Sequence, residues 1–218
     1  LPMIINTLYI VVITLLIVTP IGIASAIYLT QYARQGKLVK TIRFTTEVLS
    51  GVPSVLFGLF GYTVFCHMLG LGTSILAGCL TMTLCILPTI VRTTEESLLA
   101  VPESYKEGAL ALGAGKTRVV LGMVLPCAMP GILTAVILGM GRIVGESAAL
   151  LFTAGFGTVL YSFGEALNNS SATLTVALYL YANERGRTDI AFAIAAILMI
   201  LTLVINLSAS LVGKKLKK

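Results

Sequence analysis

The chain has 218 residues, of which 57% are hydrophobic and only 11% charged. Soluble domains are about half apolar and about a quarter charged, so this composition excludes an ordinary soluble protein. The formal net charge of +6 does not indicate nucleic-acid binding, because the basic residues form short clusters between apolar runs rather than one solvated face. The sequence therefore predicts an integral membrane protein.

Five apolar stretches are long enough to cross a membrane, whose hydrocarbon core takes about 20 helical residues. They cover residues 3–29, 48–69, 73–91, 125–152 and 190–212. Pro20, Pro53 and Pro88 lie inside the first three stretches, and membrane helices tolerate proline where neighbouring helices satisfy the carbonyl that it leaves free. We predict an all-α protein in which residues 1–218 form one membrane domain of five packed, kinked helices.

The Lys and Arg residues indicate how these helices are oriented. Twelve of the fifteen lie in three clusters of four, within residues 34–43, 92–118 and 214–218. A five-span arrangement places all three clusters on one side, and the positive-inside rule makes that side cytoplasmic. We therefore expect a cytoplasmic C-terminus, a cytoplasmic loop over residues 93–124 and an external loop over residues 153–189. The mixed apolar and polar character of the external loop predicts short amphipathic helices at the outer surface.

Metal binding and catalysis find little support in the sequence. The four cysteines contain no C-x-x-C pair and the only histidine is His67, so we expect the cysteines to be small apolar packing residues and no metal site. No nucleophile elbow or other catalytic constellation is visible, which favours a non-catalytic membrane subunit over a membrane-embedded enzyme. The chain begins Leu1-Pro2 rather than with Met, and we expect that an N-terminal piece is missing.

The cytoplasmic loop has a helical pattern of its own. Pro102 and Glu103 are typical of a helix start, and Gly113 and Gly115 of a helix stop. We predict a helix of about three turns between them, with side chains small enough for close contact with another protein. The Gly-Lys-Thr that begins at Gly115 is similar to the end of a phosphate-binding loop. The glycine that such a loop requires five residues earlier is Leu110, so we do not expect this chain to bind nucleotide.

This loop resembles the coupling segment of the membrane subunits of ABC importers, which work with a soluble binding protein. The signature of that family is E-A-A, three further residues and G, followed at a distance by L-P. Here it reads Glu107, Gly108 in place of the first alanine, Ala109 and Gly113, with Leu125-Pro126 further on. The alternative is an amphipathic helix that rests on the membrane. The resemblance implies a coupling helix that docks into a cleft of an ATPase subunit through Tyr105, Glu107, Ala109, Leu112 and Gly113.

Two charged residues, Arg142 and Glu146, lie inside the fourth apolar stretch. They are four residues apart, so on one continuous helix they would share a face near the middle of the span. A charge at that depth costs about 2.5–3.5 kcal/mol on insertion scales and usually faces a cavity. One interpretation is an ion pair that only fixes helix packing. The other is a substrate site, in which the guanidinium binds two phosphate oxygens and the carboxylate accepts the remaining proton of hydrogenphosphate in a hydrogen bond.

Three further features extend the resemblance. Arg92, toward the inner end of the third stretch, would supply a second cationic site on the substrate pathway, or else an ordinary helix cap. The R-T-T-E-E at residues 92–96, the G-R-x-x-G-E-S at residues 141–147 and the external stretch 179–184 are similar to phosphate-specific ABC permeases, in particular to their PstA-type subunit. Members of that family usually carry a further N-terminal helix.

The resemblance implies import of inorganic phosphate across the cell membrane. The implied partners are membrane lipid, a second and distinct permease subunit, two ATP-binding subunits that hold ATP and Mg, and an extracytoplasmic phosphate-binding protein. No cofactor is expected in this chain. The alternatives are a permease for another oxyanion or small solute, and an autonomous ion-coupled transporter. The latter is expected to contain an internal repeat, which the sequence does not show.

Overall fold

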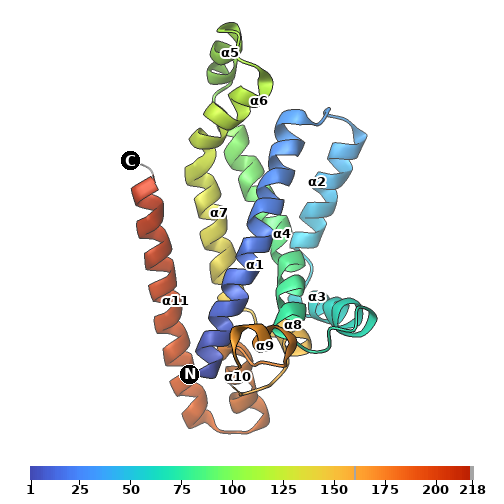
Figure 1. Ribbon diagram of the computed structural model, residues 1–218, viewed down its shortest axis with the longest axis vertical. Helices are drawn as coiled ribbons and strands as arrows, with labels where there is room; N and C mark the ends of the chain where they lie inside the picture. Colours follow the sequence, from blue (N-terminus) through green and yellow to red (C-terminus); the bar gives the residue numbers. More distant parts are fainter. Residues whose placement is uncertain (160, 217–218) are drawn as a thin grey trace.

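The computed structural model describes residues 1–159 and 161–216, and all regular structure in these residues is helical (Figure 1). Within them, four helices are long and apolar enough to cross a membrane, or five if one bent pair counts as a span. These four helices cover residues Pro2–Tyr32, Ile75–Leu99, Lys116–Gly145 and Thr188–Leu211. The prediction of an all-α membrane protein with about five spans is confirmed.

The first span consists of α1 (Pro2–Ile27) and a π-helical turn, η1 (Tyr28–Tyr32), and the third is α4 (Ile75–Leu99). Pro20 and Pro88 lie inside α1 and α4, both of which remain continuous, as the sequence predicted. Ser74 caps α4 by accepting a hydrogen bond from the backbone N–H of Ala77 at 3.2 Å. This cap satisfies one of the four N–H groups that a helix start leaves unpaired.

The second span was predicted as one helix over residues 48–69, and this is wrong. The chain instead forms α2 (Lys37–Ser50), a break, and then α3 (Ser54–Gly61) continued by η2 (Tyr62–Met68). The two parts are bent by 101°. Pro53 explains the break, because it has no N–H to donate and disfavours helical backbone in the residue before it.

The fourth predicted span, residues 125–152, is shifted toward the N-terminus. The helix runs from Lys116 to Gly145 through α6 (Lys116–Val119), η3 (Val120–Val124) and α7 (Leu125–Gly145). After Gly145 the chain leaves the helix and forms the short α8 (Ala148–Thr153). Since α4 also extends to Leu99, the connection between the third and fourth spans shrinks from the predicted residues 93–124 to residues 100–115, which hold α5 (Glu103–Ala111).

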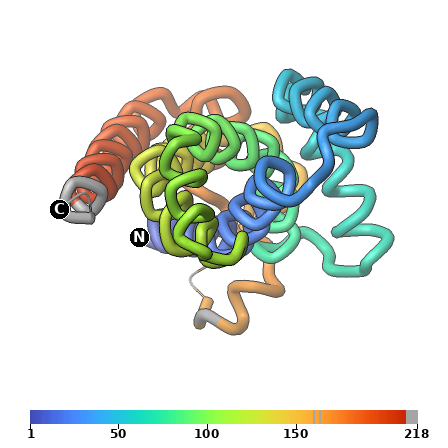
Figure 2. Tube along the Cα trace, turned by 90° about the horizontal axis from the view of Figure 1, so that it is seen from above, coloured from blue at the N-terminus to red at the C-terminus, as the bar shows by residue number. Residues whose placement is uncertain are grey.

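The core of the bundle forms where α1 and α7 pack on α4. Its fully buried side chains include Ile10, Val18, Met82, Ile86, Ile90 and Ile143. Figure 2 shows α11 (Thr188–Leu216) on one side of this core and the bent α2–α3 pair on the other. The α1–α2 connection and α5 lie at one end of the bundle, whereas α9 (Phe163–Asn168) and α10 (Leu174–Tyr179) lie at the other (Figure 1).

The segment between the last two spans was predicted to lie at the outer surface, but part of it is buried. Residues 171–177, which include the start of α10, are buried. Asn6 of α1 donates to the carbonyl oxygen of Ala172 at 3.3 Å, and the backbone N–H of Leu174 donates to Thr7 Oγ1 at 3.0 Å. These bonds allow irregular backbone to enter the bundle, because its polar groups are satisfied by α1 instead of by water.

Of the four cysteines, Cys66, Cys79 and Cys85 are buried, as expected of small apolar packing residues, whereas Cys127 is exposed. Cys127 lies on the first turn of α7, in a helix of which most of the apolar window faces outward. His67 is exposed at the end of η2.

Close packing of α3 on α8 depends on Gly58. A Cβ atom at this position would lie 2.9 Å from the Cα of Ala149 and 3.2 Å from the carbonyl oxygen of Ala148, both backbone atoms that cannot rotate away. We predict that Gly58→Ala lowers the free energy of unfolding by about 1–3 kcal/mol, the usual cost of overpacking. Thermal unfolding of the purified chain in detergent measures this change. Gly122→Ala is the control, because nothing lies within 4 Å of its Cβ position, and an equal loss in both variants would contradict the prediction.

Candidate functional site

Arg142 is partly buried and lies on the last turn of α7. Its side chain reaches α4, where Nη1 donates to Thr89 Oγ1 at 3.4 Å and Nη2 donates to Cys85 Sγ at 3.8 Å. Cys85 is the eleventh residue of α4, about 15 Å from the start of the helix at a rise of 1.5 Å per residue. The guanidinium is therefore placed near the middle of the central helix.

Glu146 does not share a helix face with Arg142, contrary to the prediction from their spacing. The helix ends at Gly145, and Glu146 has extended backbone with φ −80° and ψ 122°. Its Oε1 accepts a hydrogen bond from the N–H of Ala149 at 3.3 Å, and its carbonyl oxygen accepts one from the hydroxyl of Thr175 at 2.8 Å. Glu146 thus stabilises the break between α7 and α8 through its side chain and its backbone carbonyl.

Arg142 consequently keeps its charge without a counter-charge. In the part of the chain that the structure describes, it forms no ion pair with a carboxylate. Both of its acceptors are neutral, and the two bonds use only part of the five N–H groups of a guanidinium. Arg142 and Glu146 thus form no direct ion pair in the described structure, and the hydrogen bonds of Arg142 are to neutral groups.

The two glycines beside Arg142 leave space next to it. Apart from α7's own backbone and the adjacent residues, a Cβ atom at Gly141 or at Gly145 would meet no atom within 4 Å in the described part of the chain. Gly145 is three residues after Arg142, and residues at this spacing are neighbours on a helix surface. The small-residue face of α7 is therefore open in the single subunit, with room for a substrate or for a second chain.

Arg92 has a different environment from Arg142. It pairs with Glu96 on the next turn of α4 at 3.1 Å and with Glu47 of α2 at 3.7 Å, and its side chain is 52% exposed. These residues line a groove of about 280 Å³ between α2 and α4. The charge of Arg92 is neutralised, and no contact brings it to Arg142, so the structure does not combine the two arginines into one site.

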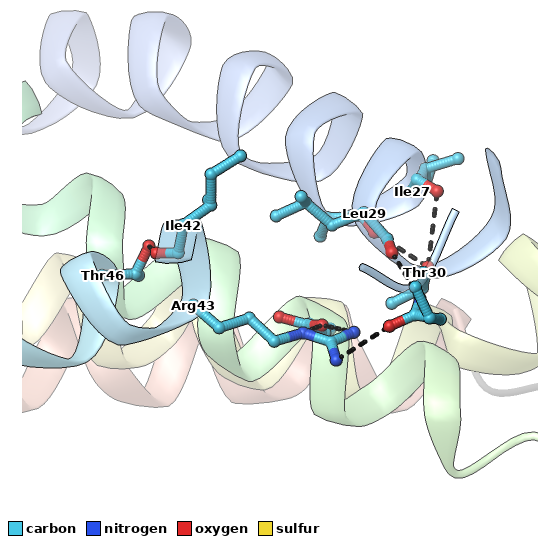
Figure 3. Close-up of polar contacts among 9 residues, drawn as sticks. Ile27, Leu29, Thr30, Ile42, Arg43 and Thr46 are labelled. Atoms are coloured by element: carbon cyan, nitrogen blue, oxygen red, sulfur yellow. Dashed lines mark hydrogen bonds and ion pairs between the residues drawn. The ribbon is translucent and has the colours of Figure 1, made fainter. Parts of the chain in front are cut away.

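A partly buried ion pair in the same region was not predicted. Nε and Nη2 of Arg43 both lie 2.5 Å from Glu95 Oε1, and Nη1 donates to Gln35 Oε1 at 3.2 Å. Figure 3 shows Arg43 with the dashed lines that mark its polar contacts. Glu95 is only 9% exposed. Its spacing from Val91 and Leu98, both buried on the same face of α4, was the signal in the sequence that this carboxylate points inward.

The predicted coupling helix is present as α5. It starts after Pro102 and stops before Gly113, whose φ of +81° is the left-handed conformation that glycine adopts at helix ends. No residue of α5 is buried, and Leu112 directly after it is 90% exposed. Three other predicted coupling residues are exposed too, namely Tyr105, Glu107 and Gly113. Ala109 is half-buried against a second cluster of buried side chains, called here the inner core, which includes Leu98 and Val119. Ala109 therefore attaches the helix to its own subunit.

The region around α5 is fixed to the first span by Tyr32 of η1. The hydroxyl of Tyr32 contacts Thr117 Oγ1 at 3.4 Å, and Nζ of Lys116 lies 5.2 Å from the centre of the Tyr32 ring. Val101 before α5 is buried, and Ala114 after it packs on the same inner core. The helix is thus held at both ends while its outer surface stays uncovered.

The sequence of residues 18–218 matches the family described as the binding-protein-dependent transport system inner membrane component. The chain belongs to this family. Membership confirms the resemblance to ABC-importer permeases and makes the chain a multi-pass membrane component of a transport system.

Individual relatives agree with this assignment. The chain is 38% identical to a probable ABC transporter permease protein, YqgI, of Bacillus subtilis, over 98% of its own length and 77% of the relative. It is 35% identical to the phosphate transport system permease protein PstA of Pasteurella multocida, over 94% of its own length and 73% of the relative.

Solved structures of two importers share the permease fold. An inward-facing structure of the MetNI methionine ABC transporter has a TM-score of 0.76 at 19% identity and covers 98% of this chain and 92% of its own. A bacterial ABC transporter involved in the import of alginate has a TM-score of 0.76 at 16% identity and covers 100% of this chain and 79% of its own. At these identities the likeness concerns the fold alone.

The Arg43–Glu95 ion pair is expected to stabilise this permease by fixing α2 to α4. Arg43→Met leaves a buried carboxylate without its partner, and since Arg43 is 37% exposed we predict a loss of about 1–3 kcal/mol in the free energy of unfolding, below the cost of breaking a fully buried pair. Thermal unfolding in detergent measures the loss.

Arg92→Met is the matched control for this variant. The partners of Arg92, Glu47 and Glu96, are 66% and 64% exposed, so we expect less than about 1 kcal/mol. In a double-mutant cycle, Arg43→Met and Glu95→Gln should be strongly non-additive. Additive losses would show that the two side chains act independently.

Proposed function

We propose that this chain is the permease subunit of an ABC importer that carries inorganic phosphate inward across the cell membrane. The observation that supports this function is the position of Arg142, an arginine near the middle of the central helix whose contacts are neutral and which has open space beside it. Guanidinium binds two oxygens of a phosphate in a planar fork. The relatives named as phosphate transport permeases, at 33–35% identity over 88% of the chain or more, favour phosphate among the oxyanions.

The proposed transport cycle is compatible with the fold. ATP and Mg would be held by two partner ATP-binding subunits, so that this chain contributes no catalytic group. Closure of those subunits would move α5, and the movement would reach the bundle through the helix that begins at Lys116 and carries Arg142 at its far end. The bundle would then open alternately to the two sides of the membrane, with Arg142 as the anion site at the centre.

We assign the remaining partners to exposed surfaces of the chain. The open glycine face of α7 would meet a second permease subunit, a distinct homologous chain, and the end that carries α9 and α10 would meet an extracytoplasmic phosphate-binding protein. Apolar side chains along α11, such as Phe192, Met199 and Leu203, would face membrane lipid. The end with α5 and the basic clusters would be cytoplasmic, and so would the C-terminus.

Arg142 and Glu146 have separable roles in this proposal. Arg142→Ala should lower phosphate uptake at least tenfold, because a hydrogen bond to a charged group contributes about 1.5–3 kcal/mol, and about 1.4 kcal/mol corresponds to tenfold. Glu146→Gln should transport within about twofold of the wild type, since the amide oxygen can still accept the N–H of Ala149.

Uptake of radiolabelled phosphate into proteoliposomes that contain the complete transporter tests both variants. Wild-type uptake by Arg142→Ala would remove this residue from the pathway and with it the main support for the proposed function. Competition by sulfate, molybdate or phosphonate in the same assay distinguishes phosphate from the alternative oxyanions.

The exposed surface of α5 and Leu112 should couple the bundle to the ATP-binding subunits. We predict that Leu112→Asp abolishes the ATP hydrolysis that the binding protein stimulates, whereas Leu112→Met retains it. Because Leu112 is 90% exposed, the charge should not change the unfolding temperature of the isolated chain. Gly113→Arg should act like Leu112→Asp, since φ at this position is +81°. Normal stimulation in both charged variants would rule out the coupling role.

A further inference from the structure

Thr89 differs from Thr81 and Thr83 of the same helix in the way its hydroxyl is used. In helices, threonine usually donates its hydroxyl proton to the carbonyl four residues earlier. Thr81 and Thr83 of α4 do so at 2.8 Å. Thr89 makes no such bond in the described structure, where the hydroxyl acts only as an acceptor for Nη1 of Arg142.

The hydroxyl proton of Thr89 is therefore available to a ligand. Arginine can only donate, so the Thr89 oxygen must be the acceptor in their contact and its own proton is directed elsewhere. Thr89 is only half-buried, so its side chain is not closed off by the rest of the chain. An unused O–H donor thus lies 3.4 Å from a guanidinium nitrogen that has no counter-ion.

Cys85 restrains the same guanidinium from the other nitrogen. Its thiol sulfur accepts from Nη2 of Arg142 at 3.8 Å, so two residues one turn apart on α4 hold the plane of the guanidinium. Sulfur is a weak acceptor, and this contact orients the group without neutralising it. The remaining N–H groups of Arg142 and the O–H of Thr89 are then donors close enough to bind different oxygens of one tetrahedral anion.

We propose that Thr89 is a second substrate-binding residue, which donates its hydroxyl to one oxygen of an oxyanion while Arg142 binds another. This inference rests on the proposed function, because it assumes that Arg142 meets the transported anion. The site would consist of one helix supplying charge and a second helix supplying a neutral donor. Since both groups only donate hydrogen bonds to the substrate, the site would select anions in which at least two oxygens on the same central atom are unprotonated.

The test compares three substitutions on α4 in the complete transporter, reconstituted with its binding protein. Thr89→Val removes the hydroxyl and keeps the shape of the side chain, and Thr89→Ser keeps the hydroxyl. Thr83→Val is the matched control, because its hydroxyl is already used by the backbone of the same helix. Phosphate uptake, stimulated ATP hydrolysis and the amount of assembled complex are measured for each.

We expect Thr89→Val to lower the amount of phosphate transported per ATP hydrolysed about tenfold, from the loss of a hydrogen bond to a charged group. Thr89→Ser and Thr83→Val should stay within about twofold of the wild type. Wild-type transport by Thr89→Val would overturn the proposal. Equal losses in Thr89→Val and Thr89→Ser would also overturn it, because they would point to packing. If Arg142→Ala transports normally, the proposed function fails whatever the Thr89 variants do.

Discussion

Burial of α4 between the other spans is the constraint on which the rest of the structure depends. In its most apolar window, 67% of the residues are buried inside the protein, against 11% for the helix that ends the chain. Large side chains of α4 therefore fill the centre of the bundle, and neighbouring helices approach it through glycine, as Gly22 of α1 does against Ile90. A polar side chain on such a helix is satisfied either by the backbone of the helix, as in Thr81 and Thr83, or by a neighbouring helix. Glu95 and Thr89 contact neighbouring helices.

Three arginines contact α4 or lie on it, and the charge of their partners distinguishes those with a structural role from the candidate substrate-binding residue. Arg43 binds the buried carboxylate of Glu95, and Arg92 binds two exposed carboxylates, so both charges are neutralised within the chain. Arg142 lies deeper and contacts only a hydroxyl and a thiol. An unpaired charge inside a membrane protein raises the free energy of the folded state. An anionic substrate bound at Arg142 would offset this unfavourable free energy.

The breaks in the helices are located where the candidate site needs them. The helix that carries Arg142 ends three residues later, and the extended backbone at Glu146 is satisfied by Ala149 and Thr175. Irregular backbone at membrane depth is stable only when protein groups complete its hydrogen bonds. The buried segment around Thr175 supplies them, and in doing so it joins the end of the bundle that holds α10 to the surroundings of Arg142.

Sequence patterns were enough to predict that the protein is embedded in a membrane and to place its five spans roughly along the chain. They also predicted a short helix that begins after Pro102 and stops before Gly113. Hydropathy, proline and glycine act locally, so these features can be read from neighbouring residues. The structure was needed to show that Glu146 leaves the helix of Arg142 and that Arg142 turns to α4. The physical reason is that these arrangements depend on partners far along the chain, since Thr175 is 29 positions from Glu146 and Thr89 is 53 positions from Arg142. Proline acts locally, but whether a membrane helix continues through it depends on the neighbouring helices, so the break at Pro53 also had to be seen in the structure.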